Sequence, residues 1–202
     1  REYAELVRKH RDQGADFIKI MISGLMDFDR FGCLTEEGLE DGIIRELVHI
    51  AHEEGMAVSV HGNGSANVLA AAMAGVDSVE HGAYLNEETL LAMEEAGTVW
   101  VPTLSTIGNL RGKGRFSEAD VGKILDSAME NVARFVSLGG LVAPGSDAGA
   151  WEVPHGITTE HTLLAQALGK HIAVTEIAAM VIREKFRTAG VSEGCIYREN
   201  LV

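Results

Sequence analysis

The stretch Asp16-Phe17-Ile18-Lys19-Ile20-Met21-Ile22 sets a lysine in the middle of an apolar run. Its residues alternate in a way that predicts a strand at about residues 16 to 22, with Phe17, Lys19 and Met21 on one face. An ammonium group with three hydrogen-bond donors is costly to bury in a strand unless it is paired, bound to metal or chemically modified. The position of Lys19 is therefore the feature that the fold must explain.

Polar side chains of the kind that bind metals end three further strand-like runs. The runs are Val58-Ser59-Val60-His61-Gly62, Ser78-Val79-Glu80-His81-Gly82 and Val142-Ala143-Pro144-Gly145-Ser146-Asp147. A single histidine at a strand end is more often a hydrogen-bonded structural residue than a ligand. Four such residues in order, on four of five predicted strands, indicate a functional site.

Short β-like runs alternate with helical segments along the chain, which is typical of βα units around a parallel sheet. Strands are expected at about residues 16–22, 57–61, 77–81, 98–104 and 141–146. Helices are expected at 42–54, between 65 and 75, between 86 and 97, from 117 to 139, near 159–168 and at 175–187. Ser117 followed by Asp120 resembles a capping box at the start of the longest helix.

This order predicts an α/β fold, namely a partial (β/α)8 TIM-type barrel that contains strands 4 to 8 with their helices. A five-stranded doubly wound sheet is the structural alternative, although no G-x-G-x-x-G follows the first strand and the chain has no P-loop. In a barrel, the long connections from Ser23 to Gly38 and from Ser105 to Arg115 rise over the catalytic face. We expect residues 1–190 to form the barrel segment and residues 191–202 a C-terminal tail.

Composition excludes several classes of partner. The 202 residues include 30 acidic and 17 basic side chains, and the formal net charge of −13 argues against nucleic acid and anionic membranes as partners. Cys33 and Cys195 form no C-x-x-C pair, so a reducing, cytoplasmic location is expected. No apolar run approaches the roughly 18 residues of a membrane span. A small-molecule substrate fits this composition, and a homo-oligomer is compatible with it.

The ordered motifs resemble the metal-dependent amidohydrolase superfamily, and within it the branch of prolidase-like and imidazolonepropionase-like enzymes. The resemblance covers about residues 14 to 169. It is carried by Ile-Lys-Ile-Met, Val-His-Gly, Val-Glu-His-Gly after Ala-Gly-Val-Asp, Val-Pro-Thr-Leu-Ser, and Pro-Gly-Ser-Asp. Each motif is short, but the combination is specific.

The resemblance implies a binuclear metal site, with two zinc ions in a full-length chain. Lys19 would be carboxylated on its ε-nitrogen and would bridge both metals, His61 and His81 would bind the second metal, and Asp147 would bind the first and handle the proton of the bridging water. Tyr84 is a candidate for polarising the substrate carbonyl, and His155 for contacting a substrate carboxylate. Packing of Tyr84 on the following helix is an equally good explanation of that residue.

Two features depart from the family pattern. The family carries a His-x-His pair on its first strand, and this chain contains no such pair. We therefore expect three strands and a His-x-His pair to precede Arg1. Beyond Gly169, the family usually continues into a small β-sandwich segment, whereas this sequence predicts a terminal helix.

The resulting prediction is a metal-dependent hydrolase of amide bonds, linear or cyclic, in small molecules such as dipeptides or N-acyl amino acids. A metal-bound hydroxide would attack the carbonyl, and Asp147 would pass its proton to the leaving nitrogen. The prediction concerns the full-length parent, and the activity of the 202 residues alone stays open. The alternative is a non-catalytic barrel fragment, or a small-molecule binding protein that retains the ligand residues. A deaminase is less favoured, because those relatives usually bind one metal and lack the strand lysine.

Overall fold

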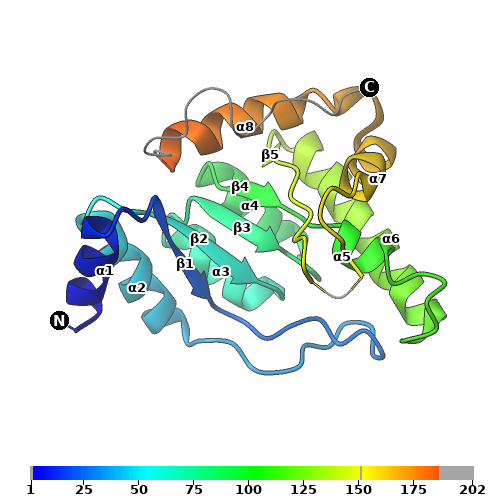
Figure 1. The fold of residues 1–202 in the computed structure, drawn as a ribbon, viewed down its shortest axis with the longest axis horizontal. Coiled ribbons are helices and arrows are strands. Elements are labelled where there is room, and N and C mark those ends of the chain that lie inside the picture. The colour runs from blue at the N-terminus through cyan, green and yellow to red at the C-terminus, as the bar shows by residue number, and fades with distance from the viewer. Residues whose placement is uncertain (1, 151, 187–202) are drawn as a thin grey trace.

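Five parallel strands form one sheet in the order β1-β2-β3-β4-β5 (Figure 1). The structure, a computed structural model, describes residues 2–150 and 152–186. The strands are β1 Phe17–Met21, β2 Ala57–Gly62, β3 Ser78–His81, β4 Val99–Val101 and β5 Leu141–Val142. Because each strand pairs with the next one in sequence, the order matches part of a (β/α)8 barrel. A doubly wound sheet would reverse its strand order at a switch point, so that alternative is wrong.

Helices connect each strand to the next, and others precede β1 and follow β5. They are α1 Glu2–Asp12, α2 Asp41–Glu53, α3 Ser65–Met73, α4 Glu87–Glu95, α5 Ser105–Gly108, α6 Glu118–Ser137, α7 Thr159–Leu168 and α8 Val174–Lys185, with a 3-10 turn at Gly169–His171. Sequence reasoning did not predict α1 or the single turn α5. Tyr3, Leu6 and Val7 have the spacing of an amphipathic helix, although only Val7 is buried, so the sequence carried a signal for α1 that the prediction did not use. Among the described residues, no helix has the length and hydropathy needed to cross a membrane.

Side-chain caps begin two of these helices. The Asn86 side chain accepts the N–H of Thr89 at 3.0 Å, and the Ser117 hydroxyl accepts the N–H of Asp120 at 3.3 Å. The capping box expected at Ser117 is only half present, because the Ser117 N–H donates to Asp29 and not to Asp120. This bond ties the start of α6 to the long loop that follows β1.

The two faces of the sheet have different environments. Val58, Val60, Val79 and Trp100 are fully buried against the helices in one continuous core. The opposite, inner face carries Lys19 and its neighbours in alternate positions, as predicted from the strand period. The inner face is therefore where polar groups of successive strands can meet.

β4 and β5 are shorter than the expected spans 98–104 and 141–146, and proline explains both endings. Pro102 and Pro144 have no N–H to donate to the ladder and follow the strands within two residues. Past Pro144, the backbone of Gly145 lies so close to β4 that a Cβ would meet Val101 at 2.3 Å. Asp147 consequently lies on a loop five residues beyond β5, and not at its last residue.

Helix α8 lies over the inner face near its β4 and β5 side (Figure 1). Ala178 is fully buried there in a small cluster with Val99, Val101 and Ala143. At the end of α8, the ring of Phe186 packs edge-on against Phe17 of β1, with centroids 5.1 Å apart. The domain boundary predicted at residue 190 lies outside the described residues.

Candidate active site

The carboxyl ends of parallel strands meet at one edge of a sheet, and this edge collects the predicted ligands. His61 is near the end of β2, His81 ends β3, and Asp147 follows β5. All three line one cavity of about 170 Å³, which they share with apolar side chains of the loop after β1. Lys19 belongs to the same inner face but does not line this cavity.

The imidazole rings of His61 and His81 pack against each other. Their ring centroids are 4.5 Å apart, and the planes meet at 61°. Burial lowers the pKa of the His81 imidazole to about 3, and the charges of His61 and Lys19 add to this effect. Burial also lowers the pKa of His61, and the hydrogen bond that the ring makes to the Gly24 carbonyl opposes this shift. Both rings are therefore neutral near pH 7, the form in which imidazole binds metals.

Hydrogen bonds orient each ring. Nδ1 of His81 lies 2.7 Å from Oγ1 of Thr103, which leaves Nε2 for a ligand. Nε2 of His61 is 3.3 Å from the Gly24 carbonyl and 3.3 Å from the Asn63 amide nitrogen, so this nitrogen is engaged by the protein. An ion bound at Nε2 of His61 would have to replace those contacts.

Residues with strained backbone conformations lie at the carboxyl edge of the sheet. Of the described non-glycine residues, four have positive φ angles, namely His81, Tyr84, Thr103 and Asp147 at 71°, 61°, 48° and 53°. For a β-branched residue such as Thr103, this left-handed conformation is a genuine outlier. Strained residues of this kind concentrate at functional sites. Their grouping at strand ends is therefore independent support for a site here.

Lys19 is more accessible than the sequence led us to expect, because the residue is exposed. Its Nζ donates to Oγ of Ser59 at 3.4 Å, and that hydroxyl donates to Oε1 of Glu80 at 2.9 Å. Desolvation lowers the pKa of Lys19, although the charges of Glu80 and Asp147 oppose the shift. A lowered pKa increases the fraction of nucleophilic, neutral amine.

Tyr84 and His155 do not lie with His61, His81 and Asp147 in the cavity. The Tyr84 ring packs edge-on against Phe31, with centroids 5.5 Å apart, and Tyr84 does not line the cavity. Its hydroxyl is buried without a hydrogen bond of regular geometry in the described structure, and burial raises its pKa. His155 is exposed on the loop between β5 and α7. Their predicted roles toward a substrate stay predictions.

Sequence reasoning missed three residues that support the site. Asn63 accepts the N–H of Ala83 and donates to the Gly24 carbonyl, and so links the loops after β1, β2 and β3. Glu80 accepts from two serine hydroxyls of the inner face. Thr103 holds His81. The strand period could have placed Glu80 beside Lys19, but Asn63 and Thr103 lie in loops whose partners no sequence pattern specifies.

The side chains of His61, His81 and Asp147 supply some, but not all, of the ligands that a divalent cation needs. Neutral imidazole and carboxylate suit zinc. Within residues 2–150 and 152–186, however, no three His, Cys, Asp or Glu side chains converge closely enough to hold an ion by themselves. The described residues thus supply two adjacent imidazoles, a nearby carboxylate and the lysine, and further donors would have to complete a site.

Glu160, on the first turn of α7, is a buried acid near this edge. It is 2% exposed, and its Oε2 accepts the N–H of Ser105 at 2.7 Å, while Oε1 has no hydrogen-bond partner in the described structure. The Ser105 hydroxyl in turn donates to the carbonyl of Ser146, next to Asp147. Burial raises the pKa of Glu160 to about 7, although hydrogen bonds from Ser105 and Leu104 oppose it. Glu160 therefore connects α7 to the loops after β4 and β5.

We expect Glu160→Gln to flatten the pH dependence of stability. Because the folded-state pKa is raised from 4.5 to about 7, the folded state binds the extra proton between these values, and stability falls as pH rises through that window. The fall is on the order of 3 kcal/mol by linkage. Urea unfolding at pH 4.5 to 8 measures it. The control is Glu176→Gln, an exposed acid on the first turn of α8. A slope equal to that of the unmodified protein in Glu160→Gln would refute the assignment.

Several known proteins are similar to this chain in fold and, more distantly, in sequence. No protein-family model matches the chain. Ochratoxinase from Aspergillus niger is 31% identical over 152 residues, which are 72% of this chain and 31% of that protein. Its crystal structure gives a TM-score of 0.71 at 25% identity and covers 91% of this chain and 43% of that one. A Xaa-Pro dipeptidase with bound methionine in the active site gives a TM-score of 0.75 at 26% identity, covering 93% and 47%.

The fold and the strand-end residues define a (β/α)8-barrel segment with a polar site at its carboxyl edge, the class to which these enzymes belong. The chain is similar to proteins of the amidohydrolase superfamily, and among them to prolidase-like members. It spans about half the length of the solved dipeptidase and about a third of the curated ochratoxinase.

Proposed function

We propose that the protein hydrolyses amide bonds, linear or cyclic, in small molecules such as dipeptides or N-acyl amino acids, with the help of divalent metal. The observation that carries this proposal is the cavity shared by His61, His81 and Asp147 at the carboxyl edge of the sheet. Proteins similar to this chain support the proposed reaction class, because they include a dipeptidase and an ochratoxinase. We further propose a cytoplasmic location.

His61 and His81 would hold one metal, and Lys19 and Asp147 would complete the site together with donors outside the described residues. A bound divalent cation lowers the pKa of water toward about 7 and polarises a carbonyl group. Asp147, on its accessible loop, would take a proton from the attacking water and return it to the leaving nitrogen. We propose zinc, about two ions per full-length chain, since imidazole and carboxylate oxygen suit that metal.

Lys19 would act as a carbamate. Its neutral amine adds to carbon dioxide, one proton leaves, and the product is an anion with two oxygen donors. The lowered pKa of Lys19 supports this step, because only the neutral amine reacts. Ser59 lies within hydrogen-bond distance of Nζ and is placed to orient the modified side chain.

A direct test uses the full-length protein and a library of dipeptides and N-acyl amino acids. Hydrolysis should disappear after treatment with a chelator and return when zinc is added. Hydrolysis that survives complete removal of metal would contradict the metal dependence, and failure to hydrolyse any member after zinc loading would contradict the function.

A binding protein that keeps the ligand residues without the chemistry is the second candidate. It is favoured by one observation, the lack of a three-donor group among the described side chains. The same library separates the two, since a binding protein would show ligand affinity without turnover.

We expect Thr103→Val to weaken zinc binding by about 10- to 100-fold, because it removes the hydroxyl that orients His81 while it keeps the shape of the side chain. Competition with a chromogenic chelator measures the affinity. The matched control is Thr98→Val at the other end of β4, whose hydroxyl bonds the Val76 carbonyl far from the site. If both variants bind zinc equally, Thr103 does not support the metal site.

A further inference from the structure

The loop that joins β1 to α2, residues 22–40, is an ordered structure that reaches over the site. Figure 1 shows it running from the end of β1 to the start of α6 and back to α2. Its two arms pair through an isolated antiparallel bridge between Met26 and Leu34, and the Thr35 N–H donates to the Leu25 carbonyl at 2.9 Å. We call this segment the β1–α2 loop.

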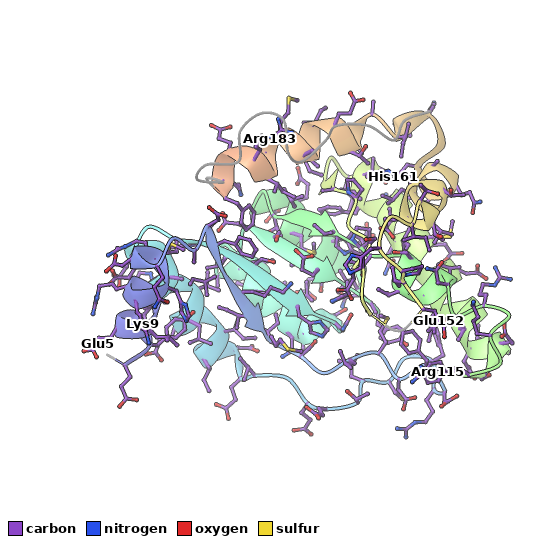
Figure 2. All side chains as sticks on the ribbon, in the orientation of Figure 1. Glu5, Lys9, Arg115, Glu152, His161 and Arg183 are labelled. Carbon is purple, nitrogen blue, oxygen red and sulfur yellow. The ribbon has the colours of Figure 1, made fainter. Side chains whose placement is uncertain are left out.

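Contacts at its tip fix the β1–α2 loop to neighbouring elements. The Phe28 ring packs against Phe116, just before α6, with centroids 5.2 Å apart. The Asp29 carboxylate accepts the N–H of Ser117 at 3.2 Å. Figure 2 shows Arg115 and Glu152 at this same end of the molecule. The loop therefore has a defined position with respect to the strand ends.

The cavity beside His61 and His81 is walled by this loop. Its apolar lining comes from Leu25, Met26, Phe28 and Phe116, together with Ala150. Met26 and Phe28 are buried, so the wall is preformed. The volume is about 170 Å³, and a cavity of about 150 Å³ lined by apolar side chains is known to accept benzene. The space therefore suits one six-membered ring or a branched aliphatic group.

The charged residues that line the cavity limit which substrate groups can bind there. Asp27 and Asp147 line the cavity, and none of its lining residues is a lysine or arginine. An acidic group held against Leu25, Met26 and Phe28 would meet no cationic side chain of the lining, so the cost of its desolvation would not be compensated there. The cavity thus disfavours acidic side chains and favours uncharged apolar ones.

We propose that this cavity is a specificity pocket that receives an aromatic or branched apolar group of the substrate beside the scissile amide. As a statement about substrates it rests on the proposed amide hydrolysis, and as a statement about binding it stands on the pocket alone. Phe28 and Met26 form the wall that selects the group. Substrates that carry only glycine, or an acidic side chain, are poor by comparison.

Binding is tested first, on the full-length protein, with 3-phenylpropanamide and propanamide as a matched pair of neutral amides. Calorimetry should show the phenyl compound binding about tenfold tighter or more, because a buried ring adds apolar contact that the ethyl group lacks. Phe28→Ala should remove most of this difference. Met73→Ala truncates an exposed apolar side chain on α3, far from the cavity, and should leave it unchanged.

A second variant covers the case in which Phe28→Ala does not fold. Ala150→Phe places a ring in the pocket from the partly exposed loop after β5 and should block the phenyl compound. Equal binding of the two amides to the unmodified protein would overturn the proposal. So would ring selectivity that survives in the folded variants.

Hydrolysis of Phe-Gly, Gly-Phe and Gly-Gly is compared next. One of the two ring-containing dipeptides should exceed Gly-Gly in kcat/KM by about tenfold or more, and Phe28→Ala should lower that ratio. Ring-selective binding without hydrolysis of any dipeptide would refute the proposed function and leave the pocket standing. Hydrolysis with no preference for the ring would refute the pocket and leave the function standing.

Discussion

Lys19→Ala should abolish hydrolysis by the full-length protein. The side chain is proposed to become the anionic bridge between two metals, so its removal takes away a donor to both. The loss should exceed the roughly 100-fold effect of changing a residue that only orients a ligand. It is measured as kcat/KM on the best dipeptide substrate, together with the zinc content of the purified variant.

The control for this experiment lies on the same strand. Met21→Ala changes the next residue on the inner face of β1, where Met21 is 61% exposed, and removes no donor. It should leave both zinc content and activity near those of the unmodified protein. An active Lys19→Ala protein with normal zinc content would refute the carbamate role.

Asp147→Asn should lower kcat by about 10² to 10⁴-fold, the range typical for removal of a group that transfers a proton in the transition state. Asparagine keeps the size of the side chain but cannot accept the proton of the attacking water. A steady-state comparison of kcat and KM is informative, because a proton-transfer role predicts that the loss falls on kcat.

Glu152→Gln is the matched control, since Glu152 follows on the same loop and pairs with Lys113 away from the ligands. We expect this variant to keep the activity of the unmodified protein. If Asp147→Asn raises KM with kcat unchanged, Asp147 binds substrate and does not transfer the proton.

The strands and most helices could be predicted because their signals are local. Alternation in β1 and glycines at 55, 75 and 97 mark element boundaries without reference to the rest of the fold. The ends of β4 and β5 were predicted too long, although Pro102 and Pro144 carried the information needed to shorten them. Helix α1 was not predicted, although the spacing of Tyr3, Leu6 and Val7 is that of an amphipathic helix.

The candidate site was predictable only where its residues end strands. His61, His81 and Asp147 share an edge because parallel strands align their carboxyl ends, which a single sequence reveals. The support from Asn63 and Thr103 depends on loop conformation, and in Thr103 on a positive φ that its residue type disfavours. Met26 and Phe28 reach the cavity through a long loop whose path depends on tertiary contacts.

We propose that these strand-end residues belong to a metal site, and metal analysis of the full-length protein tests this most directly. After reconstitution with zinc and removal of excess metal, we expect about two zinc ions per chain, the number typical of a bridged hydrolytic site. The double variant His61→Ala/His81→Ala should lose at least one of them. A folded full-length protein that retains no zinc, or a double variant that retains as much zinc as the unmodified protein, would contradict the account.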